Sequence, residues 1–151
     1  MRFAPYASCD ADRPVVLYVD DEPMNVVLMQ ALFQRRPQLE LAVARSGAEA
    51  LERADALEPA LLMLDLRLPD CHGADLLTLL RAQPGWAEVP AVAVTAEADV
   101  SLADTDFDDI WLKPLDVVFV LRQLDQMLLS QIDMLIPAAR RAYPLAATLG
   151  A

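Results

Sequence analysis

Two adjacent carboxylates, Asp20 and Asp21, directly follow the apolar run at residues 15–19, and no other pair in the chain suggests chemistry as strongly. Ionised carboxylates so close together repel each other, and they are costly at the end of a buried strand unless a cation joins them. Mg²⁺ suits this place, because it takes oxygen ligands from one or two carboxylates together with water and phosphate. The pair alone is weak evidence, but it indicates a site for a hard divalent cation.

Three further polar residues, Asp65, Thr95 and Lys113, each come directly after another short apolar run. Taken singly, an aspartate in this place usually caps a turn, and the other two are ordinary strand-end or surface residues. Taken together they suit phosphoryl transfer, because a carboxylate such as Asp65 can accept a phosphoryl group as an acyl phosphate. The cation and Lys113 would neutralise charge, and the Thr95 hydroxyl would donate a hydrogen bond to a phosphoryl oxygen.

The elements that must position these residues alternate along the chain. Near-continuous apolar runs are typical of strands buried on both faces of a parallel sheet, and they occur at 15–19, 39–44, 60–64, 91–94 and 110–112. Helical periodicity lies between them, starting at Pro23, after the capping-box pattern 46–49, over 73–81 and after Pro114. The expected apolar stripes are Leu28, Met29, Leu32 and Phe33 on the first of these helices and Val117, Leu121, Leu124 and Leu128 on the last. The alternation predicts an α/β fold with a doubly wound five-stranded parallel sheet. Such sheets bind ligands beyond the carboxyl ends of their strands, where all five polar residues would meet.

The composition bounds the class of protein. The chain has 151 residues, and its 56% hydrophobic content excludes a disordered chain. A net charge of −11 argues against direct binding of nucleic acid, since phosphate binding needs a basic face. No apolar stretch approaches the roughly 20 residues of a membrane helix. Residues 1–14 also lack the regions of a signal peptide, so we expect a cytoplasmic protein without membrane contact.

On these residues the chain resembles the receiver domain of bacterial two-component response regulators, of the stand-alone, single-domain type. The motifs that carry the resemblance are Asp20-Asp21-Glu22-Pro23, Asp65 with Leu68-Pro69 and Gly73 behind it, Thr95-Ala96 and Lys113-Pro114. They span about residues 13–129, and as a set they are highly specific, although each alone is not. The resemblance implies a flavodoxin-like three-layer sandwich that takes part in a phosphorelay.

The resemblance also implies a role for each site residue. Asp65 would be the phosphoacceptor, and a histidine kinase or histidine phosphotransfer protein would supply the phosphoryl group. The metal ligands for Mg²⁺ would be Asp20, Asp21, Asp65 and the backbone carbonyl of Arg67, and the groups that bind the phosphoryl oxygens would be Thr95 and Lys113. Phosphorylation would shift a pre-existing equilibrium and switch contacts with a downstream protein target. Such a protein is not an enzyme, since it promotes only its own phosphorylation and dephosphorylation.

The segment between Thr95 and Lys113 departs from the family pattern. It is about four residues shorter than usual, so the helix expected at 99–104 should be short or frayed. Many receivers carry Tyr or Phe three residues before the lysine, where this chain has Ile110. Trp111 cannot replace that aromatic residue, because neighbouring strand residues point to opposite faces. An aromatic switch linked to Thr95 is therefore not expected.

Arg67 and Glu97 lie two residues beyond Asp65 and Thr95, respectively. We expect these two charged side chains to pair across the site. The hypothesis that follows is that the pair hinders the water that would attack an aspartyl phosphate.

The expected organisation is an N-terminal extension at 1–13, the receiver domain at 14–130, and a helical extension with a tail at 131–151. No output domain is expected after Leu129. The helical extension, with Ile132 and Leu135, could pair two chains as a homodimer or dock on its own chain. Two other functions remain open: an interaction scaffold of receiver shape that does not switch, and a phosphohydrolase of the haloacid dehalogenase type. The latter would need an acid–base aspartate at the position of Arg67.

Overall fold

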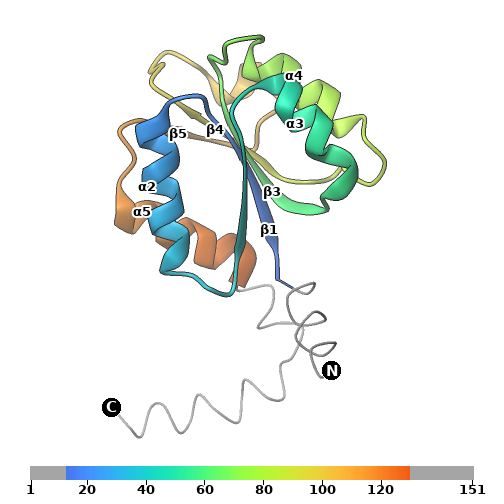
Figure 1. Ribbon diagram of the computed structural model, residues 1–151. Helices are drawn as coiled ribbons and strands as arrows, with labels where there is room; N and C mark the ends of the chain where they lie inside the picture. The colour runs from blue at the N-terminus through green and yellow to red at the C-terminus, as the bar shows by residue number, and fades with distance from the viewer. Residues whose placement is uncertain (1–12, 130–151) are drawn as a thin grey trace, which may run out of the picture. The chain divides into compact units, whose positions relative to one another are not determined.

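The protein is built on a five-stranded parallel sheet with the strand order β2-β1-β3-β4-β5 (Figure 1). A computed structural model describes residues 13–129. The strands are β1 (Val15–Val19), β2 (Glu40–Ala44), β3 (Pro59–Asp65), β4 (Ala91–Thr95) and β5 (Asp109–Leu112). All five predicted runs are therefore confirmed as strands, with boundaries that differ by one residue at most. Because the order reverses beside β1, the carboxyl ends of β1 and β3 form the switch point of the sheet.

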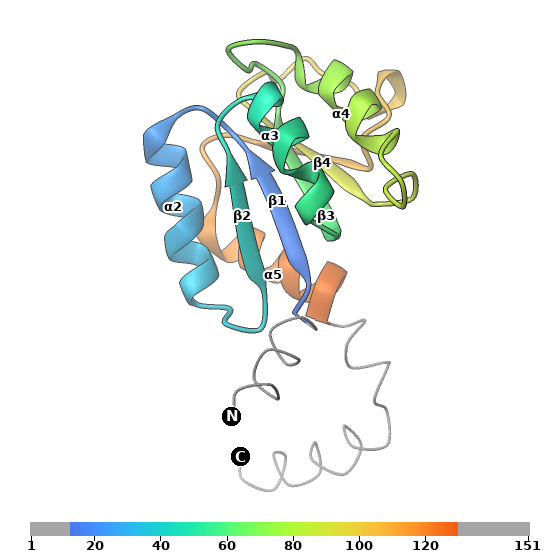
Figure 2. The same cartoon turned by 45° about the vertical axis from the view of Figure 1, so that its right-hand side comes forward.

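Helices cover both faces of this sheet. One face carries α2 (Pro23–Gln34), and the other carries α3 (Gly47–Arg53) and α4 (Gly73–Arg81), as two views of the ribbon show (Figure 1, Figure 2). A 3₁₀ turn, η1 (Ala54–Ala56), follows α3. The layers and the chain order confirm the predicted doubly wound α/β sandwich. No helix within residues 13–129 is long and apolar enough to cross a lipid bilayer.

The helix starts follow from local sequence signals. Pro23 is the first residue of α2, where its fixed φ suits a helix and its missing N–H costs nothing. At α3 the Ser46 hydroxyl accepts a hydrogen bond from the Glu49 N–H at 3.1 Å, as the capping box predicts. The Glu49 carboxylate accepts from the Arg45 N–H at 2.7 Å rather than from Ser46, which still satisfies a free backbone donor.

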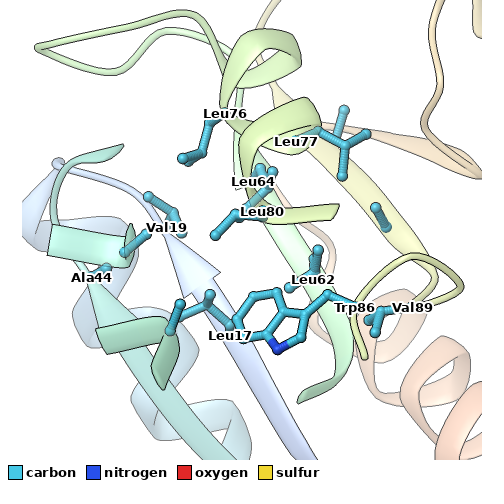
Figure 3. Close-up of a cluster of buried hydrophobic side chains, with 14 of the residues drawn as sticks. Leu17, Val19, Ala44, Leu62, Leu64, Leu76, Leu77, Leu80, Trp86 and Val89 are labelled. Atoms are coloured by element: carbon cyan, nitrogen blue, oxygen red, sulfur yellow. The ribbon is translucent and has the colours of Figure 1, made fainter. Parts of the chain in front are cut away.

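A single hydrophobic cluster fills the space between the sheet and the helices α3 and α4. Figure 3 shows leucines of β1, β3 and α4 around the indole of Trp86, which is 4% exposed. Leu17 and Val19 of β1 point into this cluster. Because successive side chains of a strand point to opposite faces, Tyr18 and Asp20 lie on the other side of the sheet.

The segment between β4 and β5 contains a single 3₁₀ turn, η2 (Leu102–Asp104). The short helix expected at 99–104 is thus reduced to one turn. Arg81 of α4 ties this segment down, since its guanidinium donates to the carbonyl of Asp106 at 3.0 Å and to the Asp108 carboxylate at 3.2 Å. It also donates to the carbonyl of Val89 at 3.0 Å. One side chain therefore joins the end of α4 to the strands that follow it.

Strand β5 confirms the predicted placement of its aromatic residue. Ile110 is half-buried and packs against the hydrophobic cluster. Trp111 is 2% exposed and outside that cluster, and its indole N–H donates to the Asp109 carboxylate at 3.1 Å. Neighbouring residues of β5 thus point to opposite faces, so no aromatic side chain occupies the position of Ile110.

A second compact unit begins at Asp116. It contains α5 (Val117–Leu124) and a π-helical turn, η3 (Asp125–Leu129). The Asp116 carboxylate caps α5 by accepting from the Phe119 N–H at 2.9 Å. The buried side chains are Val120, Leu121, Leu124 and Leu128.

Two predicted apolar stripes each need one correction. The α5 stripe includes Val120, whereas Val117 is only half-buried, because the buried face is centred slightly later in the helix. On α2 the predicted Met29, Leu32 and Phe33 are buried, but Val26 is buried in place of Leu28. The predicted N-terminal extension at 1–13 lies outside the described residues except for Arg13, and the predicted C-terminal extension at 131–151, including Ile132 and Leu135, lies outside them entirely.

Candidate functional site

The carboxyl ends of four strands bring the predicted polar residues together. Asp20 follows β1 and Asp65 ends β3, and one oxygen from each of Asp20, Asp21 and Asp65 lies within 4.8 Å of the other two. The Lys113 ammonium, just beyond β5, lies 3.0 Å from Oδ2 of Asp20 and 3.0 Å from Oδ2 of Asp65. The strand-end rule therefore predicted this cluster correctly.

Thr95 ends β4 beside Lys113. The Lys113 N–H donates to the Thr95 carbonyl at 2.8 Å, and the Thr95 hydroxyl oxygen accepts from the Glu97 N–H at 3.1 Å. Thr95 is 0% exposed, so its hydroxyl is held among polar backbone groups rather than in water. The predicted contact of this hydroxyl with a phosphoryl oxygen stays a prediction.

Asp20 is a fully buried carboxylate with four hydrogen-bond donors. Its Oδ2 accepts from the Tyr18 hydroxyl at 2.6 Å, from Asn25 Nδ2 at 3.2 Å and from Lys113. Its Oδ1 accepts from the Glu22 N–H at 3.0 Å. Burial acts to raise the pKa of Asp20, but the hydrogen bonds from Tyr18, Glu22 and Lys113 outweigh it and lower the pKa. Asp20 is therefore held ionised.

Asp65 has fewer donors than Asp20. Its Oδ2 accepts from Lys113 and its Oδ1 from the Arg67 N–H at 3.2 Å. Burial raises the pKa of Asp65, Lys113 and the Arg67 N–H lower it, and the negative charge of Asp20 adds to the rise, so the net shift is upward. Of the two buried carboxylates, Asp65 is thus the more basic.

Lys113 supplies the positive charge between them. Burial alone would lower the pKa of this ammonium, but hydrogen bonds and charge attraction from Asp20 and Asp65 raise it. The side chain is 17% exposed, so the charge is screened only partly by water. Lys113 therefore stays protonated while it bridges the two carboxylates.

The three aspartates offer a donor set that fits Mg²⁺. They provide hard carboxylate oxygens, and Asp21 is exposed and thus open to solvent and ligands. The backbone carbonyl of Arg67, on the loop after β3, stays a predicted ligand. Its N–H already ties that loop to the Asp65 carboxylate.

The predicted pair of Arg67 and Glu97 is confirmed. Arg67 Nε lies 3.3 Å from Glu97 Oε2, and one terminal nitrogen of Arg67 lies 3.4 Å from Oε1. The pair connects the loop after β3 with the loop after β4. Its predicted effect on an attacking water stays a prediction.

Close backbone packing fixes the loop that follows Asp65. The Gly73 N–H donates to the carbonyl of Leu66 at 2.8 Å. A Cβ at Gly73 would clash with the carbonyl oxygen of Asp65 and lie 2.9 Å from Leu66 Cα, so no larger side chain fits without backbone movement. Gly73 thereby lets α4 begin directly against Asp65.

The same loop also caps a neighbouring helix. The Asp70 carboxylate accepts from the N–H groups of Gly47 at 2.9 Å and Ala48 at 2.8 Å, at the start of α3. These two backbone donors lower the pKa of Asp70. The loop after β3 is therefore attached to two helices.

Tyr18 and Asn25 are site residues that the sequence analysis missed. Tyr18 lies inside an apolar run, where a tyrosine is expected to be a core residue. Asn25 lies in the first turn of a helix. A usable signal existed for Tyr18, because it stands two residues before Asp20 and so points to the same face of β1. Asn25 could have been found because helix α2 starts two residues after the carboxylate pair, so that Asn25 in its first turn stays close to the pair.

Comparisons with known proteins identify the family of this chain. The family model for the response regulator receiver domain matches residues 16–125. The DNA-binding response regulator MtrA of Mycolicibacterium smegmatis is 36% identical over 106 residues, which are 70% of this chain and 46% of MtrA. This chain therefore spans about half the length of that relative.

Solved structures show the same fold. A CheY-like receiver domain from Methylobacillus flagellatus has a TM-score of 0.66 at 25% identity, and the match covers 76% of this chain and 98% of that one. The receiver domain of sensor histidine kinase PA1611 from Pseudomonas aeruginosa PAO1 has a TM-score of 0.66 at 24% identity, covering 76% and 96%. That structure has a magnesium ion coordinated in its active site cleft. The predicted flavodoxin-like receiver fold is confirmed, and the chain belongs to the response regulator receiver domain family.

Proposed function

We propose that this protein is a phosphoacceptor signalling module of a two-component phosphorelay and that Asp65 takes the phosphoryl group. The observation that carries the proposal is the Lys113 ammonium held 3.0 Å from both Asp65 and Asp20, with Asp21 completing the acidic cluster. The donor would be a phosphohistidine of a histidine kinase or histidine phosphotransfer protein. As a bond forms between phosphorus and a carboxylate oxygen of Asp65, the phosphorus–nitrogen bond breaks and its electron pair stays on the imidazole.

The chain's own residues orient this transfer. Asp65, the more basic buried carboxylate, attacks, and Lys113 then pairs with the new phosphoryl oxygens. The Thr95 hydroxyl donates to another of these oxygens. Asp20, Asp21, Asp65 and the backbone carbonyl of Arg67 would hold Mg²⁺, which, when bound, supplies charge neutralisation to the transferring group. The magnesium ion in the PA1611 receiver domain supports this choice of metal.

The output would be a change in protein contacts. The relative MtrA is named as DNA-binding, but this chain matches less than half of it, and its own net charge of −11 disfavours direct contact with nucleic acid. We therefore propose a downstream protein target, with a homodimer as a possible signalling form and the cytoplasm as the compartment. Catalysis is limited to the protein's own phosphorylation and dephosphorylation.

One observation favours a second candidate, a receiver-shaped scaffold that does not switch. The segment between β4 and β5 has a single 3₁₀ turn, and Ile110 stands where a switching aromatic residue is common in the family. The complete site argues for phosphorylation all the same. A phosphohydrolase of the haloacid dehalogenase type is disfavoured because its acid–base position holds Arg67, and turnover of a generic phosphomonoester would test it.

The decisive experiment is the intact mass of the protein after incubation with Mg²⁺ and acetyl phosphate, next to Asp65→Asn. We expect one added phosphoryl group in the wild-type protein only. A gain in both proteins would mean that Asp65 is not the acceptor. No gain in either, with Mg²⁺ binding established and a kinase donor also tried, would favour the scaffold.

A further inference from the structure

One oxygen of the Asp20 carboxylate, Oδ2, accepts hydrogen bonds from three side chains: Tyr18, Asn25 and Lys113. A carboxylate oxygen has two lone pairs, so three donors are more than it needs. The shortest of these bonds comes from the Tyr18 hydroxyl, at 2.6 Å. Tyr18 and Asp20 are both 0% exposed, so bulk water cannot replace a donor that leaves.

Lys113 is the donor with a second partner. Its ammonium is shared equally, at 3.0 Å, between Asp20 and Asp65. A phosphoryl group carries about two negative charges at neutral pH. Once it is bound to Asp65, it attracts the ammonium more strongly than Asp20 does. Asp20 then has to remain ionised and buried with the donors that are left and with the Mg²⁺ that it would hold together with Asp21.

We propose that Tyr18 is a positioning residue of this site: its hydroxyl holds Asp20 so that Lys113 can turn to the phosphoryl group. This inference rests on the proposed phosphorylation of Asp65. A buried carboxylate that loses a charged donor is costly unless strong hydrogen bonds remain. An O–H donor at 2.6 Å from an ionised oxygen is of this strong, charge-assisted kind. Asn25, at 3.2 Å and partly exposed, gives weaker support.

Packing alone does not explain the Tyr18 hydroxyl. Phenylalanine would fill nearly the same volume in β1, and a buried hydroxyl without a partner costs free energy. The hydroxyl is accommodated because Asp20 accepts from it, and the hydrogen bond raises the pKa of Tyr18 in addition to the effect of burial. The converse, that Asp20 depends on the Tyr18 hydroxyl to stay in place, is tested by substitution of Tyr18.

The chain offers a direct probe, because Lys113 is its only lysine. Incorporation of lysine labelled with ¹³C and ¹⁵N gives a single ammonium Nζ signal by NMR. This signal is recorded without ligand and then with Mg²⁺ and beryllofluoride, which stands in for the phosphoryl group. We expect Tyr18→Phe to bind beryllofluoride about tenfold more weakly, a loss typical when an outer-shell partner is removed. Its Lys113 signal without ligand should also shift, because the ammonium moves toward Asp20.

Two further variants of the chain distinguish a positioning role of the Tyr18 hydroxyl from a packing role of the Tyr18 ring. In an Asp20→Asn background, Tyr18→Phe should leave the Lys113 signal of the ligand-free protein unchanged, because Tyr18 acts through Asp20. Trp111→Phe removes another buried aromatic donor, whose partner is Asp109, and should retain the wild-type affinity and signal.

A Tyr18→Phe protein with wild-type beryllofluoride affinity and an unshifted Lys113 signal would overturn the inference, even if it were less stable. An equal signal shift in the Asp20→Asn background would do so too. If the wild-type protein neither bound beryllofluoride nor became phosphorylated on Asp65, the proposed function would fail first and this inference with it.

Discussion

Arg67 and Glu97 form an ion pair in which Nε of the arginine lies 3.3 Å from Oε2 of the glutamate, and each stands two residues beyond a site residue. The Arg67 side chain is 78% exposed and that of Glu97 is 23% exposed. Exposed ion pairs contribute little to folding stability. The pair is therefore expected to affect access to Asp65 rather than the fold.

The first prediction is that Arg67→Ala shortens the lifetime of the aspartyl phosphate, because water reaches the phosphorus more easily. We expect a severalfold faster loss of phosphate, on the order of 1 kcal/mol in the barrier, with an unchanged melting temperature. Intact mass at timed intervals after removal of the donor measures the rate. Arg13→Ala is a matched control, since it breaks the pair with Glu40 at 3.4 Å and should leave the lifetime unchanged. An unchanged lifetime in Arg67→Ala would refute the shielding role.

The second prediction concerns the pH dependence of stability without metal. Because the folded-state pKa of Asp65 is raised above its usual 3.8, the folded protein binds this proton more tightly than the unfolded chain does. The stabilisation that the proton on Asp65 contributes is fully present below pH 3.8, and it is lost as the pH rises through the folded-state pKa of Asp65. Asp65→Asn should therefore be more stable than wild type at pH 7, by about 2–4 °C in Tm for each kcal/mol. Urea denaturation at several pH values should show this advantage shrinking toward low pH.

Asp20→Asn is the control for that experiment, and it should change stability in the opposite direction. The folded-state pKa of Asp20 is lowered, so its stabilisation is present above pH 3.8 and is lost as pH falls through the folded pKa. This variant should be less stable than wild type at pH 7 and approach it in acid. The same sign for both variants would contradict the assignment of unequal roles to the two carboxylates.

The third prediction is that Gly73→Ala disrupts the acceptor. The added Cβ would meet the backbone of Asp65 and Leu66, which cannot yield as a flexible side chain would. We expect a stability loss of about 1–3 kcal/mol and a strong loss of phosphorylation at temperatures where the variant is folded. Gly85→Ala is the matched control, because its φ of 86° makes it strained too, but in open space away from the site. Gly85→Ala should lose stability and keep phosphorylation. Full phosphorylation of Gly73→Ala would show that the loop tolerates the displacement.

The fourth prediction is that Arg81 is a main stabilising residue of the segment before β5. Arg81→Ala would leave the carbonyls of Val89 and Asp106 without this donor, and should cost about 1–3 kcal/mol of the free energy of unfolding. Arg81→Lys should rescue little, because one ammonium cannot reach both carbonyls and the Asp108 carboxylate as a planar guanidinium does. Chemical denaturation measures both variants, with Arg67→Ala as the exposed control. Wild-type stability in Arg81→Lys would show that charge alone suffices.

The strands and the cluster of site residues could be predicted because simple rules govern both. Buried parallel strands read as continuous apolar runs, and polar residues directly after such runs must gather at one edge of the sheet. Asp20, Asp65 and Lys113 obey this rule although up to 93 positions separate them. The Arg67–Glu97 pair followed from equal offsets beyond two neighbouring strand ends.

Other contacts depend on loop conformation and could not be predicted. Asp70 caps α3 across 23 positions, and this requires the loop after β3 to fold back through its own hydrogen bonds. The bonds of Arg81 likewise depend on the course of the segment before β5. Tyr18 was missed for a different reason, because an aromatic residue in an apolar run is usually core and only its hydroxyl marks it as polar.

The sole lysine has a chemical consequence for the stability of the acyl phosphate itself. An acyl phosphate is an activated mixed anhydride, and a neutral amine 3.0 Å from the carboxylate that carries it would be a nucleophile poised to form an amide. Protonation removes the lone pair that such an attack needs. Asp20 and Asp65 raise the pKa of Lys113 in the unphosphorylated site. In the proposed acyl phosphate, Asp20 and the charge of the phosphoryl group would keep this amine protonated, so Lys113 would not attack the carbonyl carbon of Asp65. Apart from the imidazole of His72, all other basic side chains of the chain are arginines, whose guanidinium groups do not lose their protons, and small acylating metabolites therefore find no reactive side-chain amine here.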